Sequence, residues 1–128
     1  MRFMTRLMLA AFFLFGFRFT TPSPTIEIIS IDMNILTRAR IDCSAFDQAF
    51  ETQMKFTTLK SQRQVGKLLS ELRTLKRSPD STATDTDTRA KLIVKYADHM
   101  EVFCADRFSV CSNGTCYEMT DRLRKMIW

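Results

Sequence analysis

The chain is short and moderately basic: its 128 residues include 19 lysines and arginines, 14 aspartates and glutamates and one histidine, giving a net charge of +5. The first 24 residues contain three of the arginines and no acid, so the remainder carries only +2, which does not indicate a nucleic-acid-binding domain. With three glycines in all, the sequence also lacks a Gly-rich loop of the kind that binds phosphates.

The N-terminus has the pattern of an export signal. Two arginines precede an apolar run from Leu7 to Phe17, which is shorter than the ~20 residues needed to span a bilayer. We predict a signal peptide and spacer over residues 1–24, a single small domain over residues 25–128, and a periplasmic, cell-envelope or secreted location. Because no A-x-A cleavage triplet follows the run, an uncleaved amphiphilic anchor or a misplaced start codon stays open. Membrane contact is expected only through this segment.

The first part of the domain predicts two strands and a short helix. Residues 25–32 are rich in β-branched side chains, and residues 36–43 alternate between polar and apolar side chains, so each segment predicts a strand. Ser44 begins a capping-box pattern with an acid three residues later, which predicts a helix start. Phe46 and Phe50 have the spacing to pack on one face of that helix.

The strongest helical pattern covers Ser61 to Lys76. Ser61 and Gln64 form a capping box at its start, and Ser78-Pro79 ends it. The apolar side chains recur at helical spacing and predict a stripe that faces the core, with a partner-binding face as the alternative. This stripe consists of Val65, Leu68, Leu69, Leu72 and Leu75.

Residues 80–88 predict a solvated polar loop, because they include no apolar side chain larger than alanine. Their three aspartates lack the spacing and the terminal glutamate of an EF-hand, so a calcium site is not expected. The cysteines have no C-x2-C knuckle of a zinc site. We therefore predict no metal and no cofactor.

A run of short antiparallel strands is predicted between residues 89 and 120. Alternating patterns cover residues 91–96 and 100–105, with Leu92 and Val94 expected to face the core and the lysines to face water. Two shorter apolar runs flank Asn113-Gly114, the strongest short signal for a type I′ hairpin turn.

The chain ends in a predicted short helix. Thr120 is positioned to cap it, and Leu123 and Ile127 lie four residues apart, as expected for an inward face. The terminal Trp128 is expected to be a partly buried plug.

The four cysteines predict two disulfides. In a hairpin that turns at Asn113-Gly114, Cys111 faces Cys116 in a non-hydrogen-bonded pair, with Cα atoms about 4.5 Å apart. Cys43 and Cys104 both end predicted strands and are the favoured second pair, which would close a long loop. Because four cysteines allow three connectivities, the pattern stays open, and reduced thiols are the alternative.

No enzyme is predicted, and no catalytic residue is assigned. The only histidine, His99, lies in a predicted hairpin turn, where solvent exposure is expected. The cysteines include no C-x-x-C pair, which argues against a thioredoxin-like redox couple. The enzymatic alternative is a small thiol-dependent hydrolase that uses Cys104 or Cys43 with His99.

The C-terminal third resembles a group of small exported proteins from gut anaerobes. The residues that carry the resemblance are Arg89-Ala90-Lys91, Cys104 to Phe108, Asn113-Gly114, Tyr117 and Leu123 to Ile127. The resemblance covers about the last forty residues and implies a shared layout of export segment, two strands, helix, polar loop, meander and terminal helix. These motifs are structural, and no established activity comes with them.

Together, these patterns predict an α+β fold in which an antiparallel sheet of four to six strands carries the Ser61–Lys76 helix on one face. The predicted function is that of a non-catalytic exported domain that binds a protein or glycan partner or serves the cell envelope. The alternative is a secreted inhibitor or effector that contacts a host protein through the hairpin tip at Asn113 and Gly114. Asn113 also begins an N-glycosylation sequon, which matters only in a eukaryotic secretory pathway.

Overall fold

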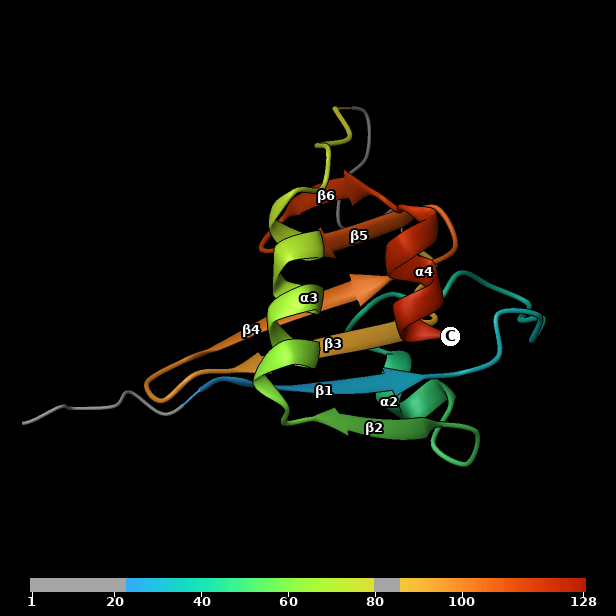
Figure 1. Ribbon diagram of the computed structural model, residues 1–128. Helices are drawn as coiled ribbons and strands as arrows, with labels where there is room; N and C mark the ends of the chain where they lie inside the picture. Colours follow the sequence, from blue (N-terminus) through green and yellow to red (C-terminus); the bar gives the residue numbers. More distant parts are fainter. Residues whose placement is uncertain (1–22, 80–85) are drawn as a thin grey trace, which may run out of the picture.

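The computed structural model describes residues 23–79 and 86–128, which form one antiparallel sheet with helices on both faces (Figure 1). The elements in chain order are β1 (Thr25–Ser30), α2 (Phe46–Ala49), β2 (Lys55–Leu59), α3 (Gln62–Arg73), β3 (Ala90–Lys95), β4 (Met100–Ala105), β5 (Ser109–Ser112), β6 (Thr115–Glu118) and α4 (Asp121–Ile127). The strand order across the sheet is β2-β1-β3-β4-β5-β6. This arrangement confirms the predicted α+β class and the antiparallel sheet.

Helices α3 and α4 lie side by side on one face of the sheet (Figure 1). Val65, Leu68 and Leu72 of the predicted stripe are buried against that face, together with Leu123 and Ile127 of α4. The strands contribute Ile26, Ile28, Ala90, Leu92, Val94, Ala105 and Val110 to the same core. The helical layer therefore covers the sheet through the residues that the helical spacing indicated.

The opposite face of the sheet is covered in part by α2 and the chain around it. Phe46 and Phe50 pack with ring centroids 5.5 Å apart and form a second, smaller core with Ile29 and Ile31. Lys91 also lies on this face, where its ammonium is 3.2 Å from a carboxylate oxygen of Asp47 and its side chain is only 14% exposed. The prediction that the β3 lysines face water is therefore wrong for Lys91, because α2 covers it.

The strand predicted over residues 36–43 is wrong, and the strand β2 at Lys55–Leu59 was not predicted. Residues 36–43 form a loop anchored through Ile41, whose amide donates to Asp87 Oδ1 and whose carbonyl accepts from the Thr88 amide. Ile41 packs against the core around Phe46 and Cys43 is bonded to Cys104, whereas Leu36 is exposed. β2 pairs with β1 at the edge of the sheet, and its residues are mostly exposed, so it has no buried face to mark it.

The helix starts differ in how their free amides are satisfied. Ser61 is the N-cap of α3, as predicted, but its side chain makes no capping hydrogen bond. The short helix α2 begins after Ala45, and Asp42 Oδ1 accepts from the Ala45 amide, so the expected Ser44 capping box is replaced by an Asp42 turn. Thr120 caps α4 as predicted, with its hydroxyl oxygen accepting from the Leu123 amide at 3.0 Å.

The hairpin between β5 and β6 follows the expected geometry. Asn113 and Gly114 both have positive φ angles, 50° and 76°, as a type I′ turn requires. Ser112 faces Thr115, and Cys111 faces Cys116. Residues 76–78 then run along the outer side of β6, where the Ser78 amide donates to the Cys116 carbonyl.

The predicted signal peptide and spacer lie outside the described residues except for Ser23 and Pro24. Among the described helices, none has the length and hydropathy to cross a membrane. Most of the predicted polar loop, residues 80–85, is also outside the described part. Its last residues differ from the prediction, because Thr86 and Thr88 are buried.

Candidate anion-binding site

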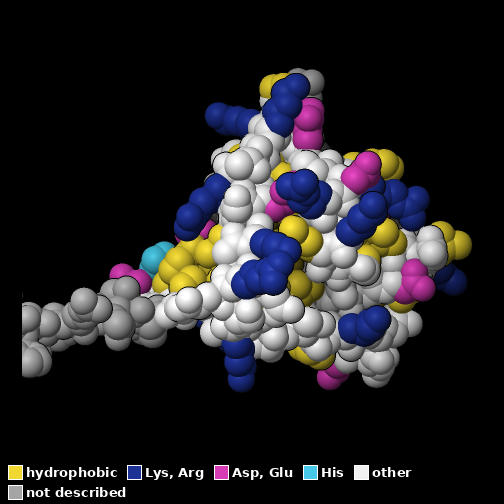
Figure 2. Space-filling view, viewed as in Figure 1, with side chains coloured by type: hydrophobic (Ala, Val, Ile, Leu, Met, Phe, Trp, Pro, Cys, Tyr) yellow, Lys and Arg dark blue, Asp and Glu magenta, His cyan; other side chains and the backbone are white. Residues whose placement is uncertain are grey.

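Positive charge is concentrated on α3, α4 and the residues that adjoin them. Residues 60–77 and 120–128, which contain α3 and α4, hold nine basic residues and two acids, a net charge of +7. The basic residues are Lys60, Arg63, Lys67, Arg73, Lys76, Arg77, Arg122, Arg124 and Lys125. The other described residues hold seven basic residues and ten acids, a net charge of −3. Figure 2 shows many Lys and Arg side chains spread over the helical face.

Most of these basic side chains are exposed and unneutralised. Lys67, Arg73 and Lys125 are exposed and have no ion-pair partner among the described residues. Arg124 pairs with Asp121 at 2.6 Å, and Arg122 lies 3.9 Å from Glu71. Exposed cations without partners attract anions over a distance of about a Debye length, ~8 Å at physiological salt. This layer, residues 60–77 and 120–128, is called the basic face below.

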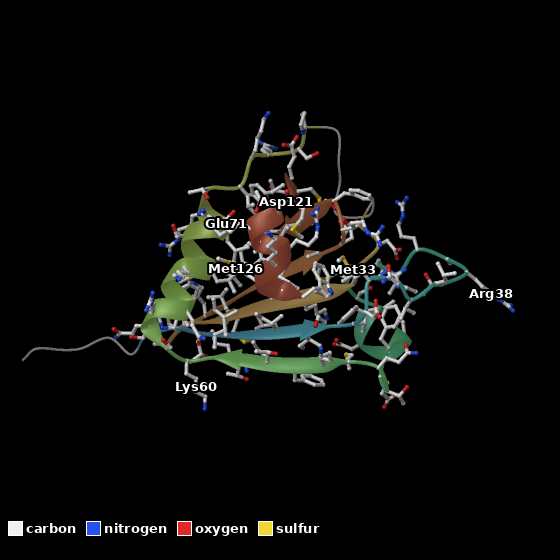
Figure 3. All side chains as sticks on the ribbon, turned by 45° about the vertical axis from the view of Figure 1, so that its right-hand side comes forward. Met33, Arg38, Lys60, Glu71, Asp121 and Met126 are labelled. Atoms are coloured by element: carbon white, nitrogen blue, oxygen red, sulfur yellow. A yellow bond between two sulfur atoms is a disulfide. The ribbon has the colours of Figure 1, made fainter. Side chains whose placement is uncertain are left out.

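A groove runs between α3 and α4 within the basic face. It has a volume of about 590 Å³ and is lined by Gly66, Lys67, Ser70, Glu71, Arg122 and Met126. A Cβ atom added at Gly66 would meet no atom within 4 Å, so this glycine opens the groove on the α3 side. Figure 3 shows Glu71 and Met126 between the two helices.

Glu71 places one negative group among these cations. Its side chain is 13% exposed, and one carboxylate oxygen accepts a 2.7 Å hydrogen bond from the Thr120 hydroxyl. The other carboxylate oxygen is 3.9 Å from the Arg122 guanidinium. A ligand in the groove would therefore meet cations at Lys67 and Arg122 and hydrogen-bonding groups at Glu71 and Ser70.

The two disulfides join the pairs that the sequence favoured. Cys43 is bonded to Cys104, with Cα atoms 5.8 Å apart, and Cys111 is bonded to Cys116, with Cα atoms 4.0 Å apart. None of the four cysteines is free. Two structural disulfides indicate an oxidising, non-cytoplasmic environment.

His99 is not placed near a cysteine. It lies in the β3–β4 turn, 53% exposed, stacked on Tyr96 with ring centroids 4.4 Å apart. A hydrogen bond from the His99 ring holds the pKa of the Asp98 carboxyl below its usual range. Cys104 is five residues further along β4, about 16 Å away in an extended strand. The hydrolase alternative thus has neither a free thiol nor an adjacent base.

The hairpin tip named as a contact candidate is solvent-exposed at Asn113 and Gly114. Beside it, Gly114 lines a small hollow of about 290 Å³ with Arg77, Ser78 and Cys116. Within residues 23–79 and 86–128, no three His, Cys, Asp or Glu side chains are grouped as a metal site would require.

Comparison with known protein families, curated proteins and solved structures found no match to this chain. The resemblance of its C-terminal third to exported proteins of gut anaerobes therefore stays a prediction.

The basic face was not predicted from the sequence. Its cations come from two segments more than forty residues apart, and neither contains a run of like charges. Gly66, in the middle of the predicted helix, was the available signal. A glycine there destabilises a helix by about 1 kcal/mol relative to alanine, which suggests a use for the space it leaves.

Proposed function

We propose that this protein is an exported, non-catalytic domain that binds an anionic polysaccharide along its basic face. The observation that carries the proposal is the charge distribution: +7 on residues 60–77 and 120–128 against −3 on the rest of the described residues. An exported location agrees with the two disulfides and with the N-terminal sequence pattern.

The groove chemistry favours a carbohydrate over other polyanions. A sugar chain offers hydroxyl groups as well as acidic groups, and Glu71 and Ser70 can accept hydrogen bonds from hydroxyls while Lys67 and Arg122 bind the acids. Binding of single-stranded nucleic acid normally uses aromatic side chains as stacking platforms. None of the described residues that line the groove is aromatic.

The dimensions of the face suit an extended ligand. The twelve residues of α3 span about 18 Å, with Arg63 at one end and Arg73 at the other. Arg122 of α4 lies on the far side of the groove from Lys67. A linear chain of acidic sugars could follow the groove and contact cations on both helices.

The test is a binding titration of the full chain with heparin, with polygalacturonate and with uncharged dextran. We expect saturable binding to the two acidic polymers that weakens as salt is added, and none to dextran. Lys67→Glu removes an attraction and adds a repulsion, so it should weaken binding roughly three- to tenfold. The matched control is Arg38→Glu, which makes the same charge change on an exposed loop residue away from α3 and α4 (Figure 3).

A second variant separates the groove from the overall charge. Gly66→Leu leaves every charge in place and puts a side chain into open space, so it should preserve the fold and weaken binding. Equal binding by Lys67→Glu and Arg38→Glu would contradict the proposal. Tighter binding of single-stranded DNA or of anionic lipid vesicles than of either acidic polysaccharide would assign the face to a different partner.

A further inference from the structure

All four cysteines meet on one face of the sheet, the face opposite α3 and α4. Cys104 of β4 is the cross-strand partner of Cys111 of β5, and Cys111 is in turn the partner of Cys116 of β6. Partners in an antiparallel pair project to the same side of the sheet. Cys104 and Cys111 are thus neighbours, although each belongs to a different disulfide.

The expected spacing between Cys104 and Cys111 suits a disulfide. The Cα atoms of Cys111 and Cys116 are 4.0 Å apart, the close approach of a non-hydrogen-bonded pair. In an antiparallel sheet, a residue that forms a non-hydrogen-bonded pair with the strand on one side forms a hydrogen-bonded pair with the strand on its other side. Cys111 therefore forms a hydrogen-bonded pair with Cys104, and in such pairs the Cα atoms lie about 5.5 Å apart. That separation is within the range that disulfides occupy.

Cys43 is the most accessible of the four cysteines. Cys104, Cys111 and Cys116 are buried, whereas Cys43 lies on the loop before α2 and is partly exposed. Thr86 is buried beside Cys111, with its hydroxyl 2.8 Å from Cys111 Sγ. Since the disulfide sulfur has no proton, the Thr86 hydroxyl is the donor. A thiolate arriving from solvent therefore meets Cys43 first.

We propose that the two disulfides form an exchange relay, independent of the polysaccharide site, that accepts an external thiolate at Cys43 and releases a thiolate at Cys116. In the first step a small monothiol, as its thiolate, attacks Cys43 Sγ. A mixed disulfide forms on Cys43, the Cys43–Cys104 bond breaks, and Cys104 leaves as a thiolate.

In the second step the Cys104 thiolate attacks Cys111 Sγ. A Cys104–Cys111 bond forms, the Cys111–Cys116 bond breaks, and Cys116 leaves as the thiolate. The hydrogen bond from Thr86 withdraws electron density from the sulfur under attack. Each step makes one disulfide and breaks one, so the only species consumed is the external thiolate.

The released thiolate lies at the β6 edge of the sheet. Cys116 lines the hollow beside the hairpin tip, together with Ser78 and Gly114. The relay thus moves a reactive sulfur from the Cys43 loop to the β6 edge of the sheet while the sheet keeps a covalent staple.

The first test uses Cys43→Ser, which leaves Cys104 without its partner beside the intact second disulfide. The folded variant is incubated at mildly alkaline pH and alkylated, and the labelled and disulfide-linked peptides are mapped by mass spectrometry. We expect the label on Cys116 as well as on Cys104, together with a Cys104–Cys111 linked peptide. Label confined to Cys104 would overturn the relay.

Cys104→Ser is the matched control, because it also leaves one odd thiol but places it on Cys43, which is not a cross-strand neighbour of Cys111. Its label should stay on Cys43. A second measurement avoids any dependence on variant folding: the unmodified protein is treated with glutathione and then alkylated. Glutathione on Cys43 with the free thiol on Cys116 supports the relay, and glutathione on Cys43 with the free thiol only on Cys104 contradicts it.

Discussion

Thr120 Oγ1 donates a 2.7 Å hydrogen bond to Glu71 Oε1, and the same hydroxyl oxygen accepts from the amide of Leu123. One side chain thus caps α4 and fixes it to α3, and it holds the single acid of the groove in place. The geometry of the proposed binding site depends on this contact between two helices that are far apart in the sequence.

Thr120→Ala should destabilise the protein by about 1–2 kcal/mol, because it removes the helix cap and leaves the largely buried Glu71 carboxylate without its donor. Urea denaturation measures the change. Thr120→Ser keeps the hydroxyl and is the control, expected to lie within about 0.5 kcal/mol of the unmodified protein. Equal losses for the alanine and serine variants would show that the hydroxyl does not stabilise the contact.

The two disulfides should contribute unequally to stability. Their sequence separations are 61 and 5 residues, for which the chain-entropy relation gives about 4 and about 2 kcal/mol. We expect Cys43→Ser/Cys104→Ser to lower the free energy of unfolding by about 2 kcal/mol more than Cys111→Ser/Cys116→Ser. Urea denaturation of the two double variants compares them directly. A larger loss from the hairpin pair would contradict the loop-length argument.

Asp42 should make the domain less stable in acid. Hydrogen bonds from the Ser44 hydroxyl and the Ala45 amide hold the pKa of its carboxyl below the usual range. Because the folded-state pKa is the lower one, this stabilisation is present above the unfolded pKa of about 3.9 and is lost as pH falls through the folded value. Unfolding measured across that window should vary less steeply with pH in Asp42→Asn. Parallel pH profiles would count against this role.

The second core behind the sheet should be essential for folding although it is small. Phe46 is fully buried between α2 and the sheet, so Phe46→Ala should cost about 3–5 kcal/mol. Leu36→Ala is the control, because Leu36 is 94% exposed and should change stability by less than about 0.5 kcal/mol. Thermal unfolding followed by circular dichroism distinguishes them. A Phe46→Ala variant as stable as Leu36→Ala would mean that α2 and its core do not unfold together with the sheet.

Local sequence patterns predicted most strands of the sheet and the helices α3 and α4. The Asn113-Gly114 turn fixed the pairing of Cys111 with Cys116, because the register of a two-residue hairpin follows from the turn itself. The α3 stripe was visible because its apolar residues repeat at helical spacing over three turns.

Features that depend on distant segments were not predicted. β2 is an exposed edge strand that pairs with β1 only after a long connection, so neither burial nor a turn marks it. Lys91 was expected to face water because α2, which covers it, comes from more than forty residues earlier in the chain. The local sequence around Lys91 does not show this contact. The basic face was missed for the same reason, since α3 and α4 become neighbours only in the folded protein (Figure 1).

The most direct test of the central claim is nuclear magnetic resonance mapping of a heparin-derived oligosaccharide on the isotope-labelled protein. We predict that the largest amide shift changes occur around the groove, at Gly66, Lys67, Ser70 and Arg122. Half-saturation of these changes should require roughly three- to tenfold more oligosaccharide in Lys67→Glu, and an unchanged amount in Arg38→Glu. Shift changes centred on Asn113 and Gly114, or none on α3 and α4, would contradict the account and move the contact to the hairpin tip or to another surface.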